Sequence, residues 1–353
     1  MITAGPGGAS AGGGTLSRLI AESVATRERV ETLSRQVATN RVADTFGGLG
    51  LGARTSLTLR PQIARAEAWQ GNIEAVQGRL AETQSALKGV AGIASKFHAD
   101  TGKLYEASEV DMMAWQAREA LKTMAGLLNG RSGDTYVFAG QDSANPPIPD
   151  SDDILTSPFV TGIRDAVQGL AANGAAATAA ATLGVASGDS PFSAGLVGLG
   201  GEAAPRVEVG EGQYVQVGVL ADRNTLAESA GDSTTGSYMR DVMRALATIG
   251  SLSGAQASAP GFKALVEDTR SSLHGAIAAM ATETGALGNL EAGLDTRKTH
   301  LADQAVVLKK QLSPVEDVDM AEALSRLTEA QTRLQASYQL ISGTRELSLV
   351  NFL

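Results

Sequence analysis

Cysteine is absent from the 353-residue sequence, which excludes disulfides, zinc–thiolate sites and thiol nucleophiles. Aromatic residues make up only 4% of it, and lysine and arginine form no dense cluster, so nucleic-acid binding is not expected. No apolar run reaches the roughly 18 residues that a membrane-spanning helix needs, so no membrane insertion is expected. The segment 1–15 is rich in glycine and alanine and differs from a secretory signal peptide. Export of such a chain would need another route.

Residues suited to catalysis or metal binding are few and scattered. The three histidines, His98, His274 and His300, lie far apart in the sequence, and none has a partner at the spacing of metal ligands. Ser143 has no histidine nearby in the sequence that could activate it as a nucleophile. The GLGLG segment at 48–52 neither follows a strand nor opens a helix at the offset of a dinucleotide-binding loop. The sequence therefore predicts no catalytic, cofactor-binding or metal site, and a protein that is not an enzyme.

Charge is distributed unevenly along the chain, whose net charge is −9. Residues 141–254 hold 13 acidic and 5 basic residues, whereas the rest of the chain holds 25 acidic and 24 basic residues. Charged side chains are rarely buried unless they are paired. We therefore expect the acidic middle to be a solvated surface domain and the balanced ends to contact other protein.

The N-terminal part of the chain shows helical periodicity. From Leu16 to Val37, apolar and small residues recur three and four positions apart, which predicts a helix over 16–39 with a partly polar stripe. Four glycines at 47–54 interrupt the pattern and predict a loop. Pro61 suits the first turn of a second helix, whose apolar heptad repeat is typical of a coiled coil. Its heptad positions are Ala66, Trp69, Ile73, Val76, Leu80, Thr83, Leu87, Val90, Ala94 and Phe97.

The C-terminal part carries a matching pattern. A long stripe runs through Leu273, Ile277, Met280, Thr284, Leu287, Leu290, Leu294, Arg297, Leu301, Ala305, Leu308 and Leu312. Pro314 ends or bends this helix. The last helix, over 315–343, carries Met320, Leu324, Leu327, Gln331, Leu334, Tyr338 and Ile341 on one face, and the chain closes with the apolar run LSLVNFL. Burying one leucine is worth about 1.5–3 kcal/mol, so the stripes of the two ends should pack on each other.

The middle of the chain has a different pattern. A helical face stops at Asn129, followed by glycine, a typical C-terminal signal. Residues 136–138 form a short β-prone run. Alternating valines at 205–220 predict a β-hairpin with its turn near Glu211, and 234–252 has the apolar spacing of a helix. We therefore expect a small β-rich insertion with a helix or two.

These patterns predict a mainly α fold, an elongated rod of long antiparallel helices from both termini, forming a coiled-coil-like bundle with a central β-containing insertion domain. Antiparallel packing would place the acidic insertion at the far tip of the rod. The predicted parts are a flexible Gly-rich lead at 1–15, a terminal-helix assembly domain at 16–58 and 313–353, a helical rod domain at 59–140 and 255–312, and an acidic β-containing insertion domain at 141–254.

Two segments carry a family resemblance. The segment GDTYVFAGQDSANPPI at 133–148 resembles the Gly-x-Tyr-x-Phe-(Ala/Ser)-Gly signature, followed by Pro-Pro, of the flagellar hook-associated protein 3 family, the hook–filament junction proteins. The segment VEDVDMAEALSRLTEAQTRLQASYQLISGTRELSLVNFL at 315–353 resembles the C-terminal end that flagellins and junction proteins share. The chain is thus similar to the flagellin superfamily over roughly 16–140 and 262–353.

The resemblance implies a structural subunit of the bacterial flagellum that joins hook to filament by self-assembly through its terminal helices. It also implies export through the flagellar type III apparatus without a cleaved signal peptide, and an extracellular location. The implied partners are further copies of the chain in a ring or helical assembly, flagellin, another hook-associated protein, and a flagellar export chaperone that covers the C-terminal helix before secretion.

Other functions remain open at this point. A filament flagellin shares the terminal motifs, although the Phe-Ala-Gly motif and the Leu-Ser-Leu-x-x-Phe-Leu close favour the junction proteins. A non-flagellar coiled-coil signalling module could share the heptads, but it would lack a β-containing insertion and an apolar C-terminus. An enzyme is the least favoured alternative, because the chain offers so little catalytic chemistry.

Under the flagellar interpretation, the functional residues are those that pack helices and subunits. The rod core should contain Trp69, Leu80 and Phe97, with Leu287, Leu294 and Leu301 opposite. Subunit packing should involve Leu334, Tyr338, Ile341, Leu347, Leu349, Phe352 and Leu353. The residues of the family motif are Tyr136, Phe138, Ala139 and Gly140.

Overall fold

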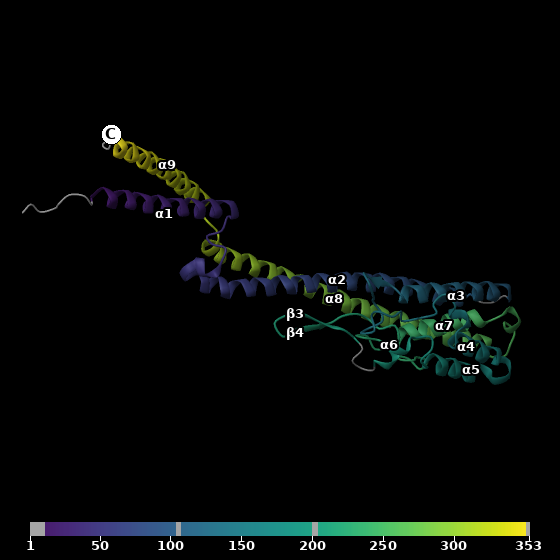
Figure 1. The fold of residues 1–353 in the computed structure, drawn as a ribbon. Helices are drawn as coiled ribbons and strands as arrows, with labels where there is room; N and C mark the ends of the chain where they lie inside the picture. Colours follow the sequence, from purple (N-terminus) through teal and green to yellow (C-terminus); the bar gives the residue numbers. More distant parts are fainter. Residues whose placement is uncertain (1–10, 104–106, 200–203, 351–353) are drawn as a thin grey trace, which may run out of the picture. The chain divides into compact units, whose positions relative to one another are not determined.

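The computed structural model describes residues 11–103, 107–199 and 204–350, and within 11–16 and 344–350 it describes the helical backbone alone. This part of the chain is predominantly helical, with two small antiparallel hairpins between long helices (Figure 1). The prediction of a mainly α fold with a central β-containing part is confirmed. The chain forms two compact units, one of Met1–Glu67 with Ala302–Leu353 and one of Ala68–Leu301.

Two long helices, α2 (Ala53–Thr101) and α8 (Phe262–Glu316), contribute to both units. Within the second unit they run antiparallel, because Glu74 pairs with Lys298 at 2.8 Å while Gln84, further along α2, bonds Glu291, earlier on α8. The heptad prediction on α2 is confirmed, since every predicted position is buried except Trp69, which is half-buried.

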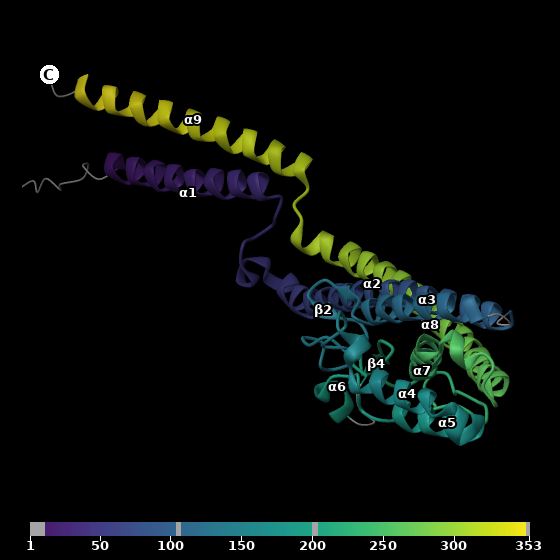
Figure 2. The same ribbon diagram turned by 90° about the vertical axis from the view of Figure 1, so that its right-hand side faces the viewer.

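In the first unit, α1 (Ala11–Thr39) and α9 (Met320–Val350) lie side by side (Figures 1 and 2). The helix α1 starts at Ala11, earlier than predicted, so glycines of the predicted flexible lead are helical; residues 1–10 lie outside the described part. Just after α1 ends and just before α9 begins, Arg41 forms a β-bridge with Asp317. The termini of the chain therefore pair as the two matching stripes predict.

The start of α2 differs from the prediction. The glycine-rich segment forms a short 3-10 helix, η1 (Phe46–Gly52), and α2 begins directly after it at Ala53, so Pro61 lies inside the helix rather than in its first turn. A proline there lacks the N–H for one helical hydrogen bond. Ser56 and Arg60, which flank that turn, both bond the Glu316 carboxylate, and we attribute the persistence of the helix to these contacts.

The second unit also contains the insertion. Between α2 and α8, the elements of this unit are α3 (Ala107–Leu128), β1 (Arg131–Ser132), β2 (Thr135–Tyr136), η2 (Ile154–Thr156), α4 (Pro158–Gln168), α5 (Leu170–Ala186), α6 (Ala194–Gly198), β3 (Arg206–Gly210), β4 (Gln213–Gln216), α7 (Tyr238–Ser251) and η4 (Gly254–Gln256). The predicted hairpin is confirmed as β3–β4, and the predicted helix at 234–252 as α7.

The expectation of a β-rich insertion is wrong, because most of its regular secondary structure is helical. Alanine, which dominates the segment that becomes α5, has the highest intrinsic helix propensity of all residues. Its helices α4, α5 and α7 pack on one another, and α7 also packs on α3.

The insertion lies along the α2–α8 pair rather than at its tip, as Figure 2 shows for α4 to α7. Its contacts with the two long helices run from Asn72 on α2, which bonds Glu208, to Asp268 on α8, which pairs with Arg244 at 2.7 Å. The predicted placement at the far tip is therefore wrong. Backbone carbonyls of the hairpin find polar partners on the sides of the long helices, a possibility that apolar stripes alone do not reveal.

Candidate functional site: the terminal helices and the contacts that hold the insertion

The contact between α1 and α9 is built mainly from small side chains. The buried residues are Ser23 and Leu33 on α1, both on the predicted stripe, and Ala323 and Ala330 on α9. Small side chains let two helices approach closely. Leu324, on the predicted stripe of α9, is exposed, whereas Ala323 and Ala330, which lie outside that stripe, are buried. The contact face of α9 is therefore rotated relative to the predicted stripe, and the prediction is partly wrong.

Both helices retain exposed apolar side chains beside this contact. On α9, Leu324 is 47% exposed, Tyr338 51% and Leu340 60%; on α1, Ile20 and Val24 are exposed one turn apart. Exposed apolar side chains that flank a helix–helix contact can be covered by a further molecule. The α1–α9 pair thus has apolar surface left over after its own packing.

The predicted packing residues lie in three kinds of place. Leu80, Phe97, Leu287, Leu294 and Leu301 are buried. Trp69, Leu334 and Ile341 are half-buried, and Tyr338 is exposed. Leu347, Leu349, Phe352 and Leu353 lie outside the described side chains. The role of Leu334, Tyr338, Ile341 and these last four residues in subunit packing stays a prediction, as does the role of the other residues in the rod core.

Glu316, at the end of α8, is the polar centre of the first unit. Arg60 donates to its carboxylate from Nε at 2.6 Å and from Nη2 at 2.7 Å, Ser56 donates its hydroxyl, and Val42 donates its N–H to the Glu316 carbonyl. The hydrogen bond from Arg60 holds the pKa of Glu316 below its ordinary value. Sequence reasoning missed this role, because all three partners are remote from Glu316 in the sequence.

The Tyr-x-Phe-Ala-Gly motif is held against α2. Arg79 donates from Nη2 to the carbonyl oxygens of Tyr136 at 3.3 Å and Val137 at 3.0 Å. Phe138 and Ala139 are buried, and the Phe138 carbonyl accepts from the N–H of residue 221 at 3.1 Å. Gly140 has φ +63°, a left-handed conformation that favours glycine. The motif residues thus fix the path of the backbone where the chain leaves α3 and enters the insertion.

The β3–β4 hairpin is held by two side chains of the long helices, which we call the hairpin clamp. Asn72 of α2 donates to the Glu208 carbonyl at 2.8 Å, and Arg297 of α8 donates from Nε to the Val209 carbonyl at 2.7 Å. Arg297 was predicted on the apolar stripe of α8, where a charged residue is unusual. The clamp explains its presence there.

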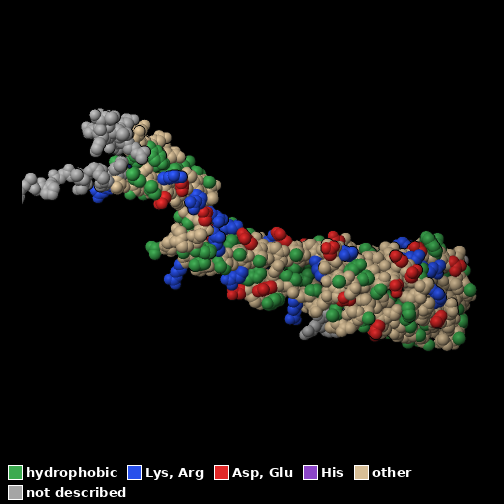
Figure 3. All heavy atoms as spheres, in the orientation of Figure 1, with side chains coloured by type: hydrophobic (Ala, Val, Ile, Leu, Met, Phe, Trp, Pro, Cys, Tyr) green, Lys and Arg blue, Asp and Glu red, His purple; other side chains and the backbone are tan. Residues whose placement is uncertain are grey.

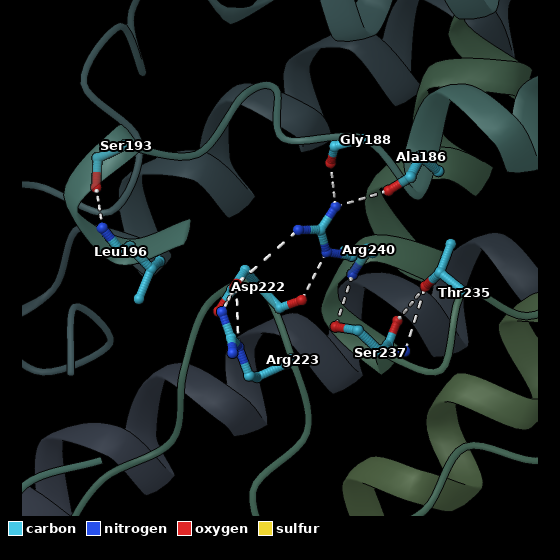
Figure 4. A network of polar contacts seen from close by, with 9 residues as sticks. All are labelled: Ala186, Gly188, Ser193, Leu196, Asp222, Arg223, Thr235, Ser237 and Arg240. Atoms are coloured by element: carbon cyan, nitrogen blue, oxygen red, sulfur yellow. Dashed lines mark hydrogen bonds and ion pairs between the residues drawn. The ribbon is translucent and has the colours of Figure 1, made fainter. Parts of the chain in front are cut away.

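A buried polar network holds the other end of the insertion together (Figure 4). Arg240 of α7 donates from Nε to the Asp222 carbonyl at 2.6 Å, and from Nη1 to the carbonyls of Ala186, at 2.9 Å, and Gly188. Its guanidinium also lies 4.6 Å from the ring centroid of Phe192. Burial lowers the pKa of Arg240. The expectation that the acidic middle is simply a solvated surface domain is thus wrong for α7, which is buried from end to end.

His98 and His274 are brought together although 176 positions separate them, with ring centroids 5.6 Å apart. Among the described residues, no group of three or more His, Asp and Glu side chains is placed to hold a metal ion. No helix in this part of the chain combines the length and hydropathy of a membrane span. On the face shown in Figure 3, acidic and basic side chains are interspersed.

Comparison with known proteins places these features in a family context. Residues 271–353 match the family model of the bacterial flagellin C-terminal helical region. The fold is similar to that of a solved structure from Vibrio parahaemolyticus, described as a flagellar hook-associated protein, with a TM-score of 0.51 and 11% identity over 77% of this chain and 99% of that chain. None of the curated proteins compared with the chain matches it. The resemblance to the flagellin superfamily that 315–353 carries is confirmed.

Proposed function

Because residues 271–353 match the flagellin C-terminal helical region and the fold is similar to that of a flagellar hook-associated protein, we propose that the chain is a structural, non-enzymatic subunit of the bacterial flagellum. It joins hook to filament by self-assembly through α1 and α9. Tyr136, Phe138, Ala139 and Gly140, the residues that resemble the junction-protein signature, favour this role over that of a filament flagellin.

The observation that carries the proposal is the apolar surface that the α1–α9 pair leaves exposed. Leu324, Tyr338 and Leu340 on α9 stay exposed after α1 has packed on this helix. Covering these side chains with the same helices of neighbouring copies would bury apolar surface at about 25 cal/mol per Å². A closed ring would cover them in every copy, and a helical array in every copy except those at its ends.

The remaining parts of the proposal concern partners and location. Flagellin and another hook-associated protein contact the assembled subunits on either side. Before assembly, an export chaperone covers α9, whose exposed leucines would otherwise promote aggregation. The chain reaches its extracellular place on the flagellum through the type III apparatus without a cleaved signal peptide.

Self-assembly can be tested with matched surface variants. Leu324→Ser removes an apolar side chain that is 47% exposed on α9, whereas Leu226→Ser removes one that is 49% exposed in the second unit. A half-buried leucine that becomes covered gains about 1 kcal/mol, so Leu324→Ser should weaken each subunit contact about fivefold. Sedimentation should show this loss for Leu324→Ser and wild-type behaviour for Leu226→Ser. Equal behaviour of the two variants would contradict assembly through α9.

A deletion tests the C-terminal end. Removing residues 344–353 should leave a soluble, largely helical monomer by circular dichroism that no longer assembles. Retained assembly of the truncated chain would refute the proposed role of this segment in subunit packing.

The junction role is tested in the cell. A null mutant should form hooks without filaments and release filament protein into the medium, as seen by electron microscopy of the flagellar stubs. Copy number separates the alternative: a filament flagellin makes up the bulk of sheared filaments, and a junction protein only a trace at their base. A bulk amount would assign the chain to the filament.

A further inference from the structure

A pocket of about 730 Å³ lies in the insertion of the second unit. Two separate segments line it, residues 148–158 and 189–198, which we call its two walls. This volume lies within the range of pockets that bind ligands in proteins. No residue of α1 or α9, the proposed assembly helices, lines this pocket.

Apolar side chains line much of the pocket, and they come from both walls. They are Ile148, Pro149, Pro158, Pro191, Phe192, Ala194 and Val197. Ile148 and Phe192 are buried in the structure, so they form a floor rather than a rim. An apolar group of a ligand would therefore lose its contact with water in the pocket.

Hydrogen bonds fix both walls before any ligand arrives. The Asn129 side chain accepts from the Ile148 N–H at 3.0 Å and donates to the Ile148 carbonyl at 2.8 Å. Ser193 donates its N–H to the Pro147 carbonyl at 2.9 Å, which joins one wall to the other. The Arg240 guanidinium packs on the Phe192 ring. Arg240 also donates to the backbone carbonyls of residues 186 and 188 (Figure 4). A site built in this way loses little conformational entropy on binding.

The charge of the lining has one sign. Asp150 and Asp153 belong to the first wall and Asp189 to the second, and the described residues that line the pocket include no lysine, arginine or histidine. Anionic ligands such as nucleic acids would be repelled. A cationic ligand would meet carboxylates from both walls.

We infer that this pocket binds a segment of another protein in which an apolar side chain is flanked by lysine or arginine residues. The apolar side chain packs on Phe192, and the flanking cations reach Asp150 of one wall and Asp189 of the other. A ligand with a single cationic end could pair with the carboxylates of only one wall. The presence of carboxylates on both walls therefore favours a peptide with two cations over a small amine. The partner differs from the copies that contact α9.

The inference is tested on the full chain with a rhodamine-labelled peptide, acetyl-Gly-Arg-Leu-Arg-Gly-amide, by fluorescence anisotropy. In one control peptide both arginines are replaced by glutamate, and in the other the leucine is replaced by glycine. We expect saturable binding of the first peptide alone, weakened by salt because exposed ion pairs contribute. Equal binding of the glycine peptide would mean non-specific charge attraction and would overturn the inference, as would binding of the glutamate peptide or no binding of the first.

Matched protein variants locate the binding. The double variant Asp150→Asn with Asp189→Asn should weaken binding roughly 3- to 30-fold, the loss expected for two exposed ion pairs. Asp165→Asn, on the exposed face of α4 and outside the pocket lining, should bind as the wild type does. Circular dichroism checks that each variant is folded. An equal loss in Asp165→Asn would overturn the inference. So would self-association that only the double variant abolishes, since the occupant would then be a second copy.

Discussion

Replacing Gly210 by alanine should release the β3–β4 hairpin from α8. A Cβ atom at residue 210 would lie 1.7 Å from Nη2 and 2.6 Å from Cζ of Arg297, far closer than non-bonded atoms approach. The guanidinium would have to leave, and the hydrogen bond from its Nε to the Val209 carbonyl, 2.7 Å long, would break. The two units should keep their helical content, because no residue of a helix other than Arg297 has to move.

The size of the effect follows from the environment of this bond. Val209 is only 2% exposed, so its carbonyl has poor access to water once Arg297 has left. A hydrogen bond to a charged group is worth about 1.5–3 kcal/mol under such conditions. Alanine in a strand regains about 0.5–1 kcal/mol relative to glycine. The net cost of opening the hairpin is therefore about 1–2 kcal/mol, or a roughly 5- to 30-fold increase in its open population.

Amide hydrogen exchange followed by mass spectrometry measures this population for peptides that cover the hairpin. Gly78→Ala is the matched control, since a Cβ atom there meets nothing within 4 Å; it should leave the exchange of the hairpin unchanged. In an Arg297→Ala background, Gly210→Ala should have almost no further effect, because the partner of the clash is gone. Wild-type exchange in Gly210→Ala, or full additivity with Arg297→Ala, would refute the reasoning.

Three further variants test the contacts between helices. Glu316→Gln should lower the free energy of unfolding by about 1 kcal/mol at neutral pH. Because Arg60 lowers the pKa of Glu316, the stability that the carboxylate contributes is present above its ordinary pKa of 4.5 and is lost as the pH falls through the lower pKa of the folded state. Thermal melts of wild type and variant should therefore converge in acid. Ala330→Leu should lower the free energy of unfolding of the α1–α9 pair by about 1–3 kcal/mol through overpacking, and an unchanged urea midpoint would contradict that packing. Burial, with Arg270 nearby, lowers the pKa of His98, so the stability that the neutral ring contributes is present above pH 6.5 and is lost below it. Between pH 7.5 and 5.5, the melting temperature of the wild type should therefore fall more than that of His98→Gln. Parallel falls of the two melting temperatures would argue against this cause.

The long helices could be predicted from the sequence because their pattern is local and repeated. Leu80 and Phe97 recur on a 3.5-residue period that only a paired helix can bury completely, and both are buried. The same logic fails where small side chains replace large ones. Ala323 and Ala330 form the contact face of α9 because they allow close approach, whereas Leu324, the larger residue, lies beside it.

The interior of the insertion could not be predicted, because its contacts join residues that are remote in sequence. Arg240 binds carbonyls at Ala186 and Gly188, more than fifty positions away. The net negative charge of residues 141–254 suggested a solvated domain, but a net charge does not reveal which charged side chains are buried together with their partners. His98 and His274 show the same limit, since only the antiparallel pairing of α2 with α8 brings the two rings together.

The placement of the insertion along the helices follows from polar contacts rather than from the apolar stripes. An apolar stripe is similar at every heptad and would permit the insertion to pack at several positions along the helices. Asn72, Arg79 and Arg297 each bind a particular backbone carbonyl, and these hydrogen bonds fix one position along the helices. Because every residue offers a carbonyl, these contacts recognise the path of the backbone and not the identity of the side chains it carries. The insertion can therefore change most of its surface residues and keep its position, provided that Gly210 leaves room for Arg297 and Gly140 keeps its left-handed turn.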